Sequence, residues 1–226
     1  MQISEIWRYP VKSLKGEQLQ QSEITPLGIP GDREIVVMRA LNGRPLTSRT
    51  RPTLLGLQGS INDGGVPTIN GHRWDSEAAL HLVNNAAGEQ VSLVRVPGPE
   101  RFDILPLLVA TDGTVEYLKI DRRRLRPNIV ISGVEGLKER DWPGSVLAIG
   151  DVGIRMVKLR ERCVMTTFDP DTQKQDSSVL LRIVRDLDGT AALDCSVIEP
   201  GAIRVGDNVE IVKRFLRRQP SSWPVL

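Results

Sequence analysis

Arg126-Pro127-Asn128-Ile129-Val130-Ile131-Ser132-Gly133 is the most informative stretch of this 226-residue chain. A β-branched run follows a proline and stops at a glycine, which predicts a strand over residues 128–132. In an extended chain Arg126 and Asn128 point to the same side. A guanidinium beside a carboxamide suits recognition of a phosphate or of the edge of a heterocycle. The alternative interpretation is the start of a strand that carries exposed polar groups.

Short apolar runs separated by Gly and Pro clusters surround this segment and predict further strands. Asn70-Gly71 favours a two-residue hairpin turn, because both turn positions need a positive φ. Strands at this spacing are typical of a barrel or a sandwich. The predicted strands cover residues 4–11, 17–25, 33–40, 54–61, 91–96, 145–149, 152–162, 195–198 and 208–213.

Two segments predict helices. An apolar stripe runs from Ala78 to Ala87, with Asp75 or Ser76 as the cap and Gly88 as the stop. A second stripe predicts a helix over residues 177–187. With so few helices, the expected fold class is α+β and β-rich.

The cluster Pro97-Gly98-Pro99 is the best candidate for a boundary between two halves. We therefore expect one domain over residues 1–97 and a second over residues 98–213. Residues 214–226 carry basic residues followed by Pro and Ser, and we expect a loosely held tail there.

Composition excludes several classes of protein. Thirty Lys and Arg against 28 Asp and Glu leave a charge of +2, and with few aromatic residues this disfavours nucleic-acid binding. Two cysteines cannot build a four-cysteine iron–sulfur or zinc site. No signal peptide is visible, and the longest apolar stretch, residues 104–110, is too short to cross a membrane. We expect a cytoplasmic protein without membrane contact.

Two further segments could carry chemistry. In Tyr9-Pro10-Val11-Lys12-Ser13-Leu14-Lys15-Gly16 an ammonium, a hydroxyl and free turn amides could hold an anion, although a solvated turn would look the same. Cys163 lies between Arg160 and Arg162, and positive neighbours favour a thiolate, the form that binds metals. The alternative is an inert, buried cysteine. If the strand continues through this segment, Glu161 and Cys163 share one face and the arginines the other.

These segments resemble the MOSC family, and most of all its YcbX-like, amidoxime-reducing branch. The resemblance runs in order along nearly the whole chain and implies an N-terminal β-barrel-like domain packed on a MOSC β-barrel domain. The matching segments are Tyr9 to Ser13 with Gly16, residues 46–52, residues 126–133, Trp142, Ile149-Gly150, Arg162-Cys163, Thr166-Thr167, residues 169–172 and residues 201–207.

The resemblance also implies a cofactor, a molybdenum pyranopterin, without a built-in iron–sulfur cluster. Cys163 would be the metal ligand and a catalytic residue, and Asp169 could orient its loop or relay a proton. Lys12, Ser13 and Arg49 would hold the cofactor phosphate. The remaining expected cofactor contacts are Arg126, Asn128, Arg162, Glu161 and, in a hydroxyl-rich turn, Thr111. Pyridoxal phosphate binding is a further association of MOSC domains.

Two departures from the family pattern matter. Relatives often carry Ser or Gln where this chain has Glu161, so a carboxylate could alter substrate preference. The run Arg122-Arg123-Arg124 is either a solvated face or a docking patch for an acidic electron-transfer protein.

Three functions stay open. The first is an enzyme, a molybdenum-dependent reductase of small N-hydroxylated compounds such as amidoximes, hydroxylamines and N-hydroxylated bases, fed by a separate electron-transfer protein. The second is a carrier of the cofactor or of sulfur without turnover. The third is a non-catalytic module that binds an anionic ligand.

Overall fold

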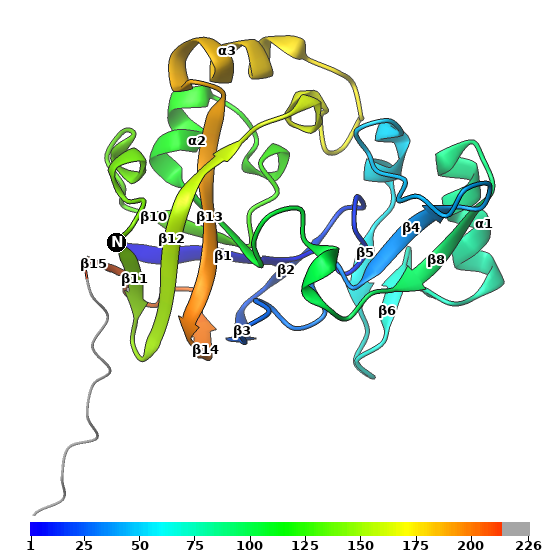
Figure 1. The fold of residues 1–226 in the computed structure, drawn as a ribbon, viewed down its shortest axis with the longest axis horizontal. Helices are drawn as coiled ribbons and strands as arrows, with labels where there is room; N and C mark the ends of the chain where they lie inside the picture. Colours follow the sequence, from blue (N-terminus) through cyan, green and yellow to red (C-terminus); the bar gives the residue numbers. More distant parts are fainter. Residues whose placement is uncertain (214–226) are drawn as a thin grey trace, which may run out of the picture.

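A computed structural model describes residues 1–213, and the expected tail over 214–226 lies outside the described residues. Its largest element is an eight-stranded sheet in the larger of two lobes (Figure 1). The sheet order is β15 (Glu210–Val212), β11 (Val146–Ile149), β12 (Val152–Glu161), β13 (Thr190–Glu199), β9 (Leu107–Thr111), β10 (Ile129–Ser132), β1 (Gln2–Arg8) and β2 (Glu17–Leu19).

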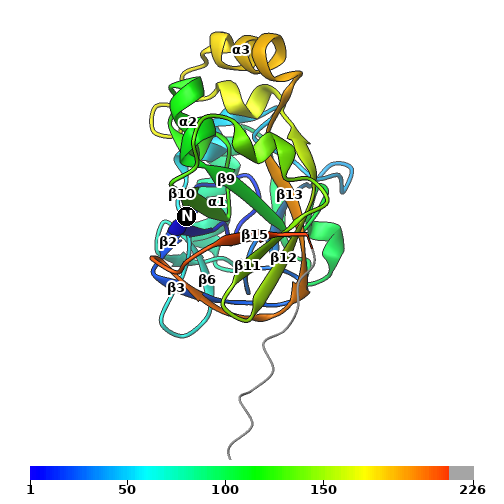
Figure 2. The same cartoon turned by 90° about the vertical axis from the view of Figure 1, so that its left-hand side faces the viewer.

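This sheet closes on itself. A bridge joins Gln2 of β1 to Asn208, just before β15, and the Ile3 amide donates to the Asp207 carbonyl at 2.9 Å. Figure 2 shows β15 crossing beside β11 and β12 at the front of the lobe. A two-stranded antiparallel sheet of β3 (Gln21–Ile24) and β14 (Gly201–Arg204) lies below these strands in the same view. The fold class expected from the sequence, α+β and β-rich, is confirmed, with a closed barrel at its centre.

The barrel interior is built from both ends of the chain. Ile3, Ile6 and Ile24 are almost completely buried against residues more than 100 positions away, including Ile129 and Leu193. Two helices, α2 (Asp112–Leu118) and α3 (Ser177–Leu187), cover the outside of the barrel and share a second apolar cluster (Figure 1). Because β9 and β10 run parallel, a crossover is needed between them, and α2 supplies part of it.

The smaller lobe contains two small sheets and one helix. They share an apolar core that includes Leu46, Leu54 and Val83. The segment Val11 to Lys15 links the lobes, since Val11 bridges Ile35 and Lys15 bridges Gln58. The elements are β4 (Ile35–Arg39) with β8 (Val91–Arg95), then β5 (Gly59–Ile61), β6 (Pro67–Ile69) and β7 (His72–Arg73), and α1 (Glu77–Ala87).

Five short 3-10 helices complete the described residues: η1 (Pro52–Gly56), η2 (Pro99–Arg101), η3 (Arg122–Arg124), η4 (Lys138–Asp141) and η5 (Val164–Thr167). No helix within residues 1–213 is long and apolar enough to cross a membrane.

Both predicted helices are confirmed, with Ser76 and Asp176 as the caps. The predicted strand over 54–61 is wrong in its first half, because Pro52 starts η1 there and only β5 is extended. The strand predicted over 17–25 is split into β2 and β3. Strand β9 and helix α2 have no counterpart in the sequence expectations. The predicted division at residue 97 stays a prediction, and β1, β2 and β3 lie in the larger lobe with strands of the second half.

Candidate functional site

A cleft of about 470 Å³ runs along the boundary of the two lobes. Eight of the ten residues predicted from the sequence line it, although they come from four separate parts of the chain. The eight are Lys12, Ser13, Arg49, Arg126, Asn128, Glu161, Arg162 and Cys163.

The turn after β1 positions Lys12 and Ser13. The Leu14 amide donates to the Val11 carbonyl at 3.2 Å, and Ser13 takes a φ of 75°, so the four residues form a turn of type II geometry. A positive φ is unfavourable for serine, so the packing of this turn imposes it. Ser13 is consequently buried, at 4% exposure, against the floor of the cleft.

Cys163 lies two residues past the end of β12. The pairing of β12 with β13 shifts register between Leu159 and Glu161, and the strand ends at Glu161. The strand therefore does not continue through Cys163, which was the condition for Glu161 and Cys163 to face away from the two arginines. Arg160, Glu161, Arg162 and Cys163 all line the cleft. The Cys163 carbonyl accepts hydrogen bonds from the Thr166 amide and hydroxyl, which start η5. Cys163 itself is partly exposed.

Positive charge dominates the cleft. Seven cationic side chains line it against three carboxylates. The cations are Lys12, Arg33, Arg49, Arg126, Lys158, Arg160 and Arg162, and the carboxylates are Asp103, Glu161 and Asp194. An anionic ligand would therefore be stabilised here, more strongly than on an open surface, because the walls reduce solvent screening.

Two arginines are held with few partners. Burial lowers the pKa of Arg126 and of Arg162 to about 10, so both remain cationic at neutral pH. Arg126 donates to the Leu14 carbonyl at 2.7 Å and stacks 4.3 Å from the Tyr9 ring centre. Arg162 donates to the Leu125 carbonyl at 2.9 Å, but its buried Nε has no partner. A buried donor without a partner is costly, and an anionic ligand would supply one.

The cleft thus fits a phosphorylated cofactor with a soft metal. The donor set combines surplus positive charge, an orphaned guanidinium nitrogen and one accessible thiol. The positive charge and the unpartnered guanidinium nitrogen suit a phosphate. A thiol sulfur is a preferred ligand of soft, redox-active metals.

Asn128 lines the cleft, and its side chain is also bonded within the fold. Its side chain is 1% exposed, and its oxygen accepts from the Leu108 amide at 3.1 Å and from Arg33 at 3.3 Å. Its amide nitrogen donates to the Trp7 carbonyl at 3.3 Å. The side chain therefore ties β1 to β9 and braces the cleft wall from behind. Arg126 has a φ of 56°, so the extended geometry that was expected to align the two side chains is absent.

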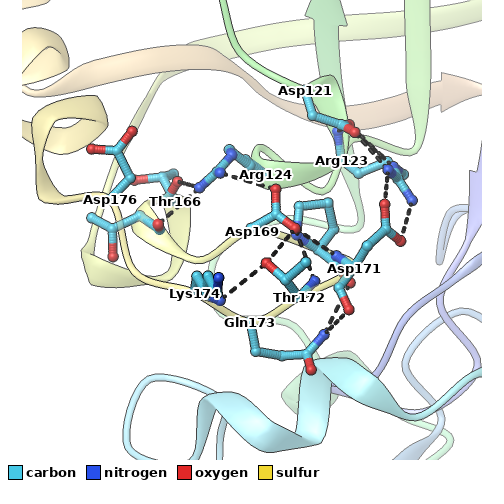
Figure 3. Close-up of polar contacts among 12 residues, drawn as sticks. Asp121, Arg123, Arg124, Thr166, Asp169, Asp171, Thr172, Gln173, Lys174 and Asp176 are labelled. Atoms are coloured by element: carbon cyan, nitrogen blue, oxygen red, sulfur yellow. Dashed lines mark hydrogen bonds and ion pairs between the residues drawn. The ribbon is translucent and has the colours of Figure 1, made fainter.

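Thr111 and Asp169 lie outside the cleft. Thr111 is fully buried, and its hydroxyl accepts from the Thr114 amide at 3.2 Å to cap α2. Asp169 organises the turn after η5, because its carboxylate accepts from the amides of Thr172 and Asp171 and pairs with Arg124 at 3.2 Å (Figure 3). The Thr172 hydrogen bond lowers the pKa of Asp169, so the carboxylate stays charged. Neither residue lines the cleft, and their predicted cofactor and catalytic roles stay predictions.

The arginine run is engaged within the chain. Arg122 pairs with Glu5, Arg123 with Asp121 at 2.6 Å, and Arg124 donates to the Thr167 carbonyl at 2.8 Å. Figure 3 shows Arg123 lying between Asp121 and Asp171, with Arg124 beside Asp169. These internal partners disfavour a free docking patch for an acidic protein.

Sequence reasoning missed three important residues of the cleft. Arg33 contacts Asn128, and Asp194 is buried at 1% exposure with one oxygen lacking a partner. Asp103 forms ion pairs with several of the cleft's cations. No local motif marks these residues; only their hydrogen bonds and ion pairs with other parts of the chain identify them.

A second cavity of about 310 Å³ lies behind Arg126 and Met165, which line both spaces. Its walls include Trp7, Tyr9 and Phe168. Tyr9 is buried, and burial raises its pKa to about 12, so its hydroxyl stays protonated and donates a hydrogen bond to the Pro127 carbonyl at 3.2 Å.

Comparison with known families and proteins gives a consistent result. The family model described as MOSC N-terminal beta barrel domain matches residues 1–103, and the MOSC domain model matches residues 100–210. Human mitochondrial amidoxime reducing component 2 is 26% identical over 278 aligned positions, covering 92% of this chain and 82% of that protein. Human mitochondrial amidoxime-reducing component 1 is also 26% identical, over 93% of this chain and 82% of its own length.

Among solved structures, the YuaD protein of Bacillus subtilis covers 93% of this chain and 94% of its own. Its TM-score is 0.49 at 12% identity, so the family assignment rests on the sequence models instead.

Proposed function

Because the chain belongs to the MOSC family, with an N-terminal barrel domain followed by a MOSC domain, we propose that it is a molybdenum cofactor-dependent reductase of N-hydroxylated compounds. The observation that supports this most directly is the meeting of Cys163 with Lys12, Arg49 and Arg162 in one cleft. The names of the relatives, which describe amidoxime reduction, support the class of substrate.

The chain's own residues would divide the binding work. Lys12, Ser13 and Arg49 would hold the phosphate of the pyranopterin, and Arg126 with Arg162 would contact its remaining polar groups. Cys163 would be the protein's ligand to the metal. When bound, the molybdenum centre supplies two-electron redox chemistry. Asn128, Thr111 and Asp169 act as positioning residues for the cleft walls and the Cys163 loop.

The overall reaction balances simply. The N–O bond of the substrate breaks, two electrons and two protons are consumed, and the products are the reduced nitrogen compound and water. The electrons would come from a separate electron-transfer protein, because two cysteines cannot build a four-cysteine cluster within the chain. A cytoplasmic location and pyridoxal phosphate binding stay predictions.

Metal analysis of the chain expressed in a host that makes the cofactor tests the proposal. We expect about one molybdenum per chain and turnover of an amidoxime with an artificial reductant. Cys163→Ser should lose the metal and the turnover, whereas Cys195→Ser, which alters a fully buried thiol, should keep both. Molybdenum retained in Cys163→Ser would refute the ligand assignment.

The same measurements separate the alternative functions. Molybdenum without turnover of any N-hydroxylated compound would indicate a carrier of the cofactor or of sulfur. A chain without molybdenum that still binds phosphate would indicate an anion-binding module.

Glu161 offers a test of substrate preference. Its carboxylate lines the cleft near the thiol that would hold the metal, so it would disfavour anionic substrates. We expect Glu161→Ser to raise kcat/KM for an anionic amidoxime relative to a neutral one, by up to about fivefold for one exposed charge. An unchanged ratio of the two kcat/KM values would contradict this role.

A further inference from the structure

Asp103 is a shared partner of three cations in the cleft. Its carboxylate lies 2.8 Å from Lys12 Nζ, 3.1 Å from an Arg49 nitrogen and 3.6 Å from an Arg160 nitrogen. These cations come from the turn after β1, from the segment before η1 and from β12. Burial alone would raise the pKa of Asp103, but the Lys12 hydrogen bond and the three positive charges lower it, so the carboxylate is charged.

The geometry around this carboxylate is that of an anion subsite. Cationic donors converge from different elements on one small group, as they would around a phosphoryl group. A carboxylate brings one negative charge and two acceptor oxygens, whereas a phosphate monoester brings up to two charges and three such oxygens. Lys12 also donates to the Arg101 carbonyl at 2.9 Å, and Arg160 pairs more closely with Asp194, at 2.9 Å. Asp103 still brings only one negative charge to the three cations, so a phosphoryl group of higher charge matches them better.

The segment that carries Asp103 can leave without unpacking a core. Asp103 keeps 40% of its side chain exposed and the adjoining Ile104 keeps 48%. Both neighbouring elements are fixed. On one side Arg101 is buried and donates to the Asp32 carbonyl at 2.8 Å, and on the other β9 starts at Leu107. Only a few residues, 102–106, would need to shift.

We propose that Asp103 is an internal counter-ion that occupies the anion subsite of Lys12, Arg49 and Arg160 and is displaced by a phosphoryl group. This deepens the proposed function, on which the identity of the phosphoryl group as the cofactor's rests. Because a ligand must displace the Asp103 carboxylate, the subsite selects anions by their charge. A monoanionic carboxylate ligand gains no charge over Asp103, so only a more highly charged anion displaces it.

Titration of inorganic phosphate into the full chain, purified from a host that makes no pterin, tests the proposal by calorimetry. We expect Asp103→Asn to bind phosphate about fivefold more tightly than the unaltered chain, the size of one half-exposed charge pair. Acetate should bind measurably to Asp103→Asn and not to the unaltered chain. Equal or weaker phosphate binding by Asp103→Asn would overturn the proposal.

Glu89→Gln is the matched control. Glu89 also joins two arginines, Arg39 at 2.7 Å and Arg51 at 3.0 Å, but it does not line the cleft. The charge change is the same, so phosphate affinity should stay as in the unaltered chain. An equal gain in Glu89→Gln would mean that net charge, and not the subsite, controls binding, and would overturn the proposal.

A crystal structure of the unaltered chain grown with phosphate keeps the inference testable if Asp103→Asn fails to fold. Phosphate bound to Lys12, with the Asp103 carboxylate moved away, would support displacement. Asp103 still bonded to Lys12 in crystals grown at a saturating phosphate concentration would refute it.

Phosphate titration of the cofactor-loaded chain identifies the source of the phosphoryl group. Loss of phosphate binding identifies the cofactor as the source, and retained binding identifies a free phosphate ester. Failure to load molybdenum would refute the proposed function and leave the phosphate comparison intact.

Discussion

The two cysteines differ in burial, and this difference separates their chemistry. Cys195 is fully buried, and burial raises the pKa of its thiol, so it stays protonated inside the barrel. Cys163 is partly exposed at the cleft and lies among arginines. A thiol reacts only where a reagent can reach it and a thiolate can form.

Native alkylation checks this difference. Iodoacetamide at pH 8 should add one group to the folded cofactor-free chain, on Cys163, and two groups to the chain in urea. Peptide mass spectrometry locates each adduct. Modification of Cys195 in the folded chain at a rate similar to that of Cys163 would contradict the buried position.

Asn128 belongs to the motif at residues 126–133, and its buried hydrogen bonds stabilise the folded chain. Asn128→Ala removes the buried partner of the Leu108 amide and of Arg33. Because unpaired buried donors cost about 1–3 kcal/mol, we expect the free energy of unfolding in urea to fall by about that amount. Asn85→Ala, which removes an exposed side chain bonded only to His81, should change it little. Equal stability of the two variants would show that the Asn128 hydrogen bonds contribute nothing.

At the scale of elements, local signals account for some parts and not for others. Helices α1 and α3 were predictable because each combines a capping side chain with an apolar stripe, and both signals lie within about a dozen residues. Helix α2 has seven residues and a glycine in its first turn. Its stability depends on packing against β9 and α3, which no local pattern reports.

Gly113 shows this packing directly. It lies in the first turn of α2, where alanine would ordinarily be the better helix former. A Cβ at this position, however, would lie 2.6 Å from the Val134 carbonyl oxygen and would also overlap the Gly136 carbonyl oxygen. We therefore expect Gly113→Ala to lower the free energy of unfolding by about 1–3 kcal/mol, the range for overpacking.

Urea denaturation of Gly113→Ala beside Gly64→Ala measures the effect. Gly64 lies in an exposed turn, where a Cβ would meet only the Asn62 side chain at 3.4 Å. The second variant should keep the stability of the unaltered chain. A stabilised Gly113→Ala would mean that helix propensity outweighs the close approach.

At the scale of the whole molecule, two carboxylates connect the lobes. Asp103 joins Lys12 and Arg49 to Arg160, and Asp171 joins Lys15 to Arg123. The Arg123 hydrogen bond lowers the pKa of Asp171 to about 2, and the Asp103 pKa is lowered as well. A carboxylate whose pKa is lower in the folded state contributes stability above its unfolded pKa. That contribution is lost as the pH falls through the folded value.

Acid should therefore weaken the connection between the lobes. We expect the free energy of unfolding to fall as the pH drops from about 4 to about 2, the window between the unfolded and folded pKa values. The double variant Asp103→Asn with Asp171→Asn should lose less stability over this window, because neither side chain can be protonated. Urea denaturation at a series of pH values measures both slopes. Parallel slopes would contradict the linkage.

The sequence by itself determined the kind of protein and eight of the residues that line the cleft. Short motifs around Lys12, Arg126 and Cys163 carry these assignments, because turns, caps and strand runs are encoded within a few residues. The exclusion of a four-cysteine iron–sulfur or zinc site, given two cysteines, also follows from the sequence alone.

Only the tertiary structure decided how these residues are used. Barrel closure brings β1 against β10 and Gln2 against Asn208, pairings across more than 100 residues that no local pattern specifies. Desolvation and ion pairing depend on those pairings. They turn Asn128 into a brace, remove Thr111 and Asp169 from the cleft, and place Asp103 among the cations that a phosphate would need. Function at this site therefore depends on contacts that exist only once the barrel has closed.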